Sequence, residues 1–175
     1  MAKDSGSGRG VTSERSSPDS ADVMLRANGW GPIRIGMTRA QVVASLGEDH
    51  NPEAVGGPDP AQCDEFRPRR APAGMLVMIE RGLLTRITLT SEADVRTDAG
   101  VRVGDASAVV EAAYGNRLTS TPHYYLAAPA RYLLVWQTPP PAESPRGIVY
   151  EIDTEDRVSR IHAGAQSITR VEGCV

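Results

Sequence analysis

A stretch of fifteen residues occurs twice in this chain, and no other feature constrains the fold as strongly. Residues 33–47 align without a gap on residues 101–115, with six of the fifteen positions identical. Each copy has a short alternating apolar segment ending at a glycine, apolar residues at helical spacing, and a second glycine where a helix cap belongs. Thr38 and Gln41 match a capping box, and Asp105 is placed to cap the second copy. The repeat predicts two short helices.

Strand-like segments follow each copy. The first half contains the segments 63–66, 75–80 and 83–90, with Arg81-Gly82 as a hairpin turn, and the second contains 123–126, 132–138, 147–152 and 157–163. Units of about 70 residues rarely bury enough surface alone, so the two should pack together. The predicted fold class is α+β: two tandem helix-plus-antiparallel-meander repeats packed into one globule. The first repeat would span 29–95, and the second, with a C-terminal tail, 96–175.

The start of the chain has a different composition. Residues 1–28 are predicted to be a disordered leader or linker, because Ser, Gly and charged residues dominate up to Asp22. Lys3 is the only lysine, against 18 arginines elsewhere, which favours an added leader in place of a removed signal peptide. A native disordered tail on a cytosolic protein is the alternative.

The order of these segments resembles a known family. A short strand into Gly36-Met37-Thr38 or Gly104-Asp105, a helix that ends at a glycine, and a meander whose last strand carries Val158 and Ile161 are similar to the β-lactamase-inhibitor protein fold. The SmpA/OmlA outer-membrane lipoproteins contain one such unit. The resemblance covers about residues 29–165 and implies a concave sheet whose aromatic-rich face binds a protein. The inhibitor's paired cysteines within each domain are absent, so a β-lactamase target is not implied.

The two cysteines allow two interpretations. Cys63 and Cys174 are 111 positions apart and neither belongs to a CxxC pair. They are either two unrelated buried thiols or one disulfide that ties down the C-terminal tail. The position of Cys174 beside the chain end favours the tether, because chain ends fray unless they are fixed. A disulfide would imply an oxidising location, periplasmic or extracellular.

Charge and motifs exclude several classes of function. The net charge of −3 argues against a protein that coats nucleic acid, and no apolar run is long enough for a membrane span, although a lipid anchor stays open. His50, His123 and His162 are scattered without metal or catalytic spacing, and the acidic residues of 151–156 are typical of a turn. We therefore expect no enzymatic activity, no metal and no cofactor.

The aromatic residues supply the candidate binding site. Six of the eight lie after residue 113, and Tyr132 and Trp136 would share one face of a strand because they are four positions apart. Core packing is the alternative interpretation. The candidate partner-binding residues are Tyr124, Tyr132, Trp136, Tyr150 and Arg160.

The sequence thus predicts a non-enzymatic, secreted or periplasmic binding protein. It would engage a protein partner through an antiparallel sheet face, as an inhibitor or an envelope-assembly protein does. The alternative is a small-ligand or glycan-binding envelope protein with a pocket between the repeats.

Overall fold

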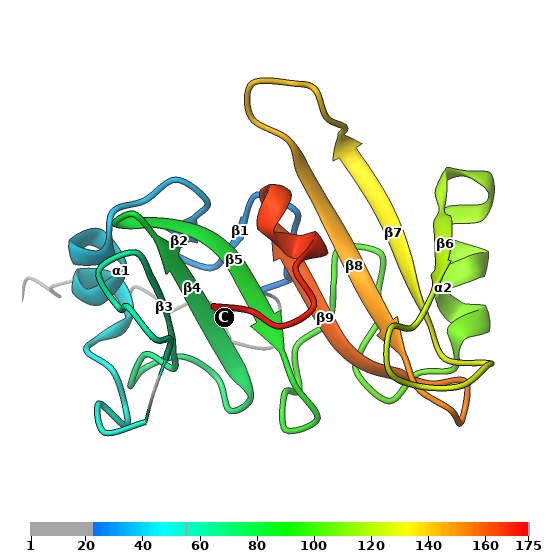
Figure 1. Cartoon of the computed structure of the whole chain (residues 1–175), viewed down its shortest axis with the longest axis horizontal. Coiled ribbons are helices and arrows are strands. Elements are labelled where there is room, and N and C mark those ends of the chain that lie inside the picture. The colour runs from blue at the N-terminus through cyan, green and yellow to red at the C-terminus, as the bar shows by residue number, and fades with distance from the viewer. Residues whose placement is uncertain (1–22, 55, 175) are drawn as a thin grey trace, which may run out of the picture.

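The computed structural model describes residues 23–54 and 56–174, and its main element is a seven-stranded antiparallel sheet (Figure 1). The strand order is β3-β4-β5-β9-β8-β7-β6. The strands are β3 (Cys63–Phe66), β4 (Met75–Glu80), β5 (Leu83–Leu89), β6 (Thr119–Pro122), β7 (Arg131–Thr138), β8 (Arg146–Ile152) and β9 (Val158–Gly164). The remaining elements are the pair β1 (Gly29–Trp30) and β2 (Ile33–Arg34), helices α1 (Arg39–Leu46) and α2 (Ser107–Tyr114), and 3-10 turns η2 (Gly115–Arg117) and η3 (Gln166–Thr169).

The predicted fold class of two helix-plus-meander repeats is wrong, because the strands of both halves form one continuous sheet. Strand β5 pairs with β9 in antiparallel register from Arg86↔Gly164 to Leu89↔Ile161. This pairing forms hydrogen bonds to backbone groups that would otherwise stay unpaired at the edge of each short meander. Both halves also contribute to one hydrophobic cluster instead of each closing a core of its own.

Local signals account for several element boundaries. The capping box at α1 is present: the Gln41 amide donates to the Thr38 hydroxyl, and the Gln41 side chain accepts from the Thr38 amide. Arg81 and Gly82, with φ of 48° and 80°, form the tight turn between β4 and β5. Asp105 does not cap α2; its carboxylate accepts from the Arg102 amide at 2.8 Å, and α2 begins after Ala106 without a side-chain cap.

Alternation along the strands gives the sheet two different faces. In β8, Ile148, Tyr150 and Ile152 belong to the main core, which also contains Val42 of α1 and Val110 of α2. We call this side the helix-side face. Val149 and Glu151 point to the opposite side, which we call the tail-side face.

The N-terminal part of the described chain packs into the helix-side core. Leu25 is fully buried, and its amide donates to the Arg96 carbonyl at 2.9 Å. Ala27 is buried as well. The folded part therefore begins within the predicted leader 1–28, while residues 1–22 lie outside the described residues.

The C-terminal tail, residues 165–174, covers part of the tail-side face. After β9 the chain passes through η3 and crosses the sheet toward β4 and β3 (Figure 1). There Cys174 forms a disulfide with Cys63, with Cα atoms 5.4 Å apart, so the predicted disulfide is confirmed. The bond is compatible with an oxidising compartment. No helix within residues 23–174 is long and apolar enough to cross a membrane.

A buried arginine fixes the path of the tail. The Arg86 guanidinium, with a side chain only 3% exposed, donates to the carbonyl oxygens of Ser167 and Arg170 and to the Glu65 carboxylate. Burial lowers the pKa of Arg86, and Glu65 opposes that effect. Arg86 thus links β5, β3 and the tail on one face.

Candidate functional site

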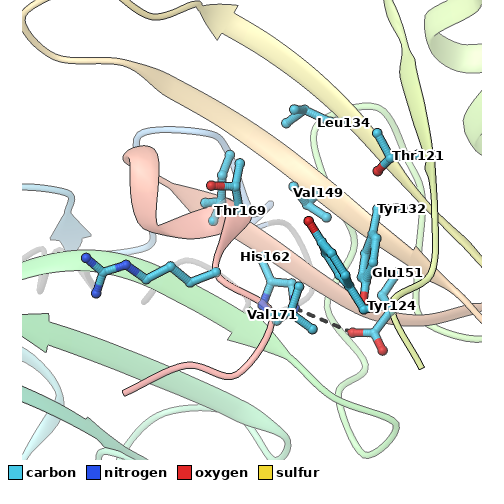
Figure 2. A pocket seen from close by; sticks show the side chains of 11 residues that line it. Thr121, Tyr124, Tyr132, Leu134, Val149, Glu151, His162, Thr169 and Val171 are labelled. Carbon is cyan, nitrogen blue, oxygen red and sulfur yellow. Dashed lines mark ion pairs between the residues drawn. The ribbon is translucent and has the colours of Figure 1, made fainter. Parts of the chain in front are cut away.

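A cavity of about 200 Å³ lies on the tail-side face between strands β7 to β9 and the tail (Figure 2). Strand β6 and the β6–β7 loop close one side. The lining residues are Thr121, Tyr124, Tyr132, Leu134, Val149, Glu151, His162, Ile168, Thr169, Arg170 and Val171. All of them come from the second half of the chain, so the cavity is not built between the two halves.

Two tyrosines form one wall of the cavity. The rings of Tyr124 and Tyr132 lie 5.9 Å apart at 45°, with Tyr124 75% exposed and Tyr132 only 8% exposed. The Tyr132 hydroxyl is buried, and the Tyr124 backbone is its polar neighbour. Burial raises the pKa of this hydroxyl, the Glu151 charge adds to the rise, and the Tyr124 backbone opposes it.

The carboxylate of Glu151 is the charged group of the cavity. Its Oε1 atom accepts from His123 Nε2 at 3.0 Å, and its Oε2 atom lies 3.7 Å from His162 Nε2 (dashed in Figure 2). His162 lowers the pKa of Glu151 to about 2; burial opposes the shift and His123 supports it. Burial lowers the pKa of His162 itself. At neutral pH the site therefore contains a carboxylate and a neutral imidazole.

Glu151, His162 and Thr88 form a row that superficially resembles a hydrolase triad. His162 Nδ1 lies 3.0 Å from the Thr88 hydroxyl, on the side of the ring away from Glu151. Thr88, however, is only 3% exposed and does not line the cavity. These three residues therefore offer no accessible nucleophile to a molecule in the cavity. Within the described ranges, no group of three His, Cys, Asp or Glu residues is placed to hold a metal ion.

Residues 123–126, predicted to be a strand, form an exposed loop instead. His123 Nδ1 accepts from the amides of Tyr125 and Leu126, both at 3.1 Å, which bends the backbone away from strand pairing. The His123 ring also stacks on Tyr132, with centroids 4.7 Å apart. The Tyr125 hydroxyl donates to Glu172 of the tail. This loop is thus fixed to both the sheet and the tail.

The structure separates the predicted site residues. Tyr124 and Tyr132 line the cavity. Trp136 lies on the same face but packs with Ile168 outside the cavity. Arg160 is exposed and stands opposite Glu151 in the strand register, but it does not line the cavity. Tyr150 is fully buried on the helix-side face, where its hydroxyl lies 2.8 Å from that of Tyr114. Consecutive residues of β8 point to opposite faces of the sheet, so Tyr150 belongs to the core whereas Glu151 lines the cavity.

Sequence reasoning missed most of the polar residues of this site. The sequence places Glu151 among the acidic residues of a turn, and it gives His123 and His162 no metal or catalytic spacing. Strand alternation is the signal that finds Glu151, because a residue next to a core tyrosine must face the opposite side. No comparable signal reveals His162, whose burial depends on the route of the tail.

Three comparisons with known proteins identify no relative. No family model, no curated protein and no solved structure matches this chain. The resemblance to the β-lactamase-inhibitor protein and the SmpA/OmlA lipoproteins therefore stays a prediction from sequence motifs.

Proposed function

We propose that this chain is a non-enzymatic binding protein that engages a protein partner through residues 123–126 and the adjoining cavity. One observation carries the proposal. Five large apolar side chains are exposed in the described part of the chain, and three of them, Tyr124, Tyr125 and Leu126, are consecutive. Exposed aromatic residues grouped at one point are typical of protein interfaces.

The loop is ordered before any partner arrives. Its backbone is held by His123, and Tyr125 is held by Glu172 of the tail. Ordering a loop on binding costs free energy, so a preordered loop retains more of its contact energy as affinity. This favours the protein-binding interpretation of the tyrosines over core packing for Tyr124, whereas Tyr150 is a core residue.

The cavity fits the side chain of a protein better than a free small ligand. Small-ligand sites typically enclose about 300–1,000 Å³, and this cavity has about 200 Å³. A membrane surface is also less favoured, because the cation beside the loop, Arg170, is paired with Glu80, and Glu172 is acidic. A small-ligand or glycan-binding protein remains the second candidate.

The disulfide supports placing this activity in the periplasm or outside the cell. Disulfides persist where the surroundings are oxidising, and Cys63–Cys174 joins the tail that forms one side of the cavity. An inhibitor and an envelope-assembly protein both belong to this class of binding protein.

The test compares the wild-type protein with the triple variant Tyr124→Ala, Tyr125→Ala, Leu126→Ala. Each is incubated with an envelope and secreted-protein extract of the host, crosslinked, and examined by mass spectrometry. The double variant Leu83→Ala, Val109→Ala is the control, because it removes similarly exposed apolar side chains elsewhere. We expect the triple variant alone to lose a saturable partner. Equal capture by all three proteins would rule out the loop as the interface.

A further inference from the structure

The cavity contains a carboxylate, Glu151, that no arginine among the described residues pairs with directly. His123 Nδ1 accepts from two backbone amides, which leaves Nε2 as the donor toward Glu151. His162 is buried, and burial disfavours its charged form. The Glu151 side chain, 17% exposed and with its pKa lowered to about 2, is a carboxylate beside these two imidazole rings.

Two of the nearby guanidinium groups are bound to other residues. Arg86 is bound to Glu65 and to tail carbonyls, and Arg170 is bound to Glu80 at 2.6 Å. Arg160, opposite Glu151 on the neighbouring strand, is exposed, and its charge helps to lower the pKa of Glu151, but it lies beyond ion-pair distance from that carboxylate. A partly buried carboxylate that is not directly paired with a guanidinium can accept a cation from outside.

A second residue beside the carboxylate contributes an aromatic surface. Tyr132 is 8% exposed, and it lines the cavity. Figure 2 shows the side chains of Tyr132 and Glu151 beside each other on the same side of the cavity.

The remaining walls suit the stem of a long basic side chain. Leu134, Val149, Ile168 and Val171 line the cavity with apolar surface, against which methylene groups pack well. The faces of tyrosine rings attract a cationic head, and both Tyr124 and Tyr132 are available there. The carboxylate, the tyrosine rings and the apolar walls are complementary to one chemical group.

We infer that this cavity receives an arginine or lysine side chain of the protein partner, with Glu151 as the counter-ion. The inference rests on the proposed function. It adds the chemistry of the group that the interface recognises. The partner segment then combines apolar contacts to residues 124–126 with one basic residue that enters the cavity.

The first experiment uses the full wild-type chain and two small probes, N-acetyl-arginine amide and N-acetyl-citrulline amide. Citrulline has nearly the shape of arginine but no charge, so only charge recognition separates them. In a ¹H–¹⁵N NMR titration we expect the arginine probe to shift the amides of Tyr124, Glu151 and His162. The citrulline probe should bind at least about tenfold more weakly.

The second experiment repeats the titration with variants. Glu151→Gln should weaken the arginine probe at least about tenfold, while Glu143→Gln, in the exposed loop at the other end of the β7–β8 hairpin, should have no effect. Tyr124→Ala, at a site 75% exposed, should also weaken binding without unfolding the protein. If Glu151→Gln fails to fold, the comparison of the arginine and citrulline probes on the wild type still tests whether the cavity recognises the positive charge.

The outcomes separate the inference from the proposed function. Equal binding of both probes, shifts outside the cavity, or binding of neutral sugars instead of the arginine probe would overturn the inference. Partner capture that depends on residues 124–126 would then still support the proposed function. A titration that behaves as expected, without any loop-dependent partner, would instead count against the proposed function.

Discussion

The two faces of the sheet differ in what holds them together. On the helix-side face, apolar residues from α1, α2, β1, β2 and the strands form one large cluster. On the tail-side face the apolar cluster is small, with Tyr132, Val149 and Ile168 as its buried members. Around it lie buried polar groups, including Arg86, Thr88 and His162.

This difference explains how one sheet can combine a stable core with the cavity that we propose as a binding site. A face covered by apolar side chains is tightly packed and leaves no room for a ligand. A face covered by a single crossing segment of chain leaves a cavity, and it needs specific bonds to keep that segment in place. Here Arg86 and the Cys63–Cys174 disulfide provide those bonds.

The largest expected effect comes from the same isoleucine-to-alanine substitution made once on each face. Ile161 on the helix side is fully buried, and Ile168 on the tail side is 2% exposed. Ile161→Ala should lower the free energy of unfolding by about 3–5 kcal/mol, and Ile168→Ala by about 2 kcal/mol, because the tail can move into the space. Urea unfolding at neutral pH measures both. An equal or larger loss for Ile168→Ala would contradict the comparison.

Removing the disulfide should affect the tail-side face first. The double variant Cys63→Ser, Cys174→Ser should lose about 2–4 kcal/mol of unfolding free energy, because the loop between the two positions is long. Hydrogen exchange should accelerate in residues 165–174, while the amides of α1 and β5 keep their relative protection. Similar acceleration on both faces would show that the bond supports the whole fold instead of the tail.

The pH dependence of stability should reveal the charged site. The pKa of Glu151 is about 2 in the folded protein against its ordinary 4.5, so its contribution is complete above pH 4.5 and is lost as the pH falls toward 2. His162 acts in the same direction below pH 6.5, because its folded form resists protonation. Glu151→Gln should remove about 1–2 kcal/mol of the acid dependence.

Chemical unfolding of the wild type, Glu151→Gln and the control Glu143→Gln at several pH values measures this dependence. The control should follow the wild type. A Glu151→Gln curve parallel to the wild type between pH 4.5 and 2 would contradict a depressed pKa at this carboxyl.

The smallest expected effect concerns the exposed loop. Tyr124→Ala should change the free energy of unfolding by less than about 0.5 kcal/mol, because the side chain is 75% exposed. The thermal unfolding midpoint should therefore match that of Val109→Ala, whose side chain is also exposed. A clear loss of stability would make Tyr124 part of the tail-side packing and weaken its assignment to an interface.

Much of the local structure follows from short-range signals. The capping box of Thr38 and Gln41, the Arg81-Gly82 turn and the apolar run of Met75–Glu80 each depend on a few neighbouring residues. The failure at residues 123–126 has a physical cause of the same kind. The His123 side chain accepts hydrogen bonds from the amides of Tyr125 and Leu126, which strand pairing would otherwise use. Sequence patterns for strands do not include such side-chain bonds.

The sequence by itself determined the short helices, most strands, and a disulfide inferred from the position of Cys174. Only the tertiary structure decided that β5 pairs with β9, that Tyr150 faces the core, and that Glu151, His162 and Tyr132 meet in one cavity. Backbone dihedrals and caps depend on neighbours along the chain. The pairing of distant strand edges and the route of the tail are chosen by the whole fold, since they depend on which buried groups find partners.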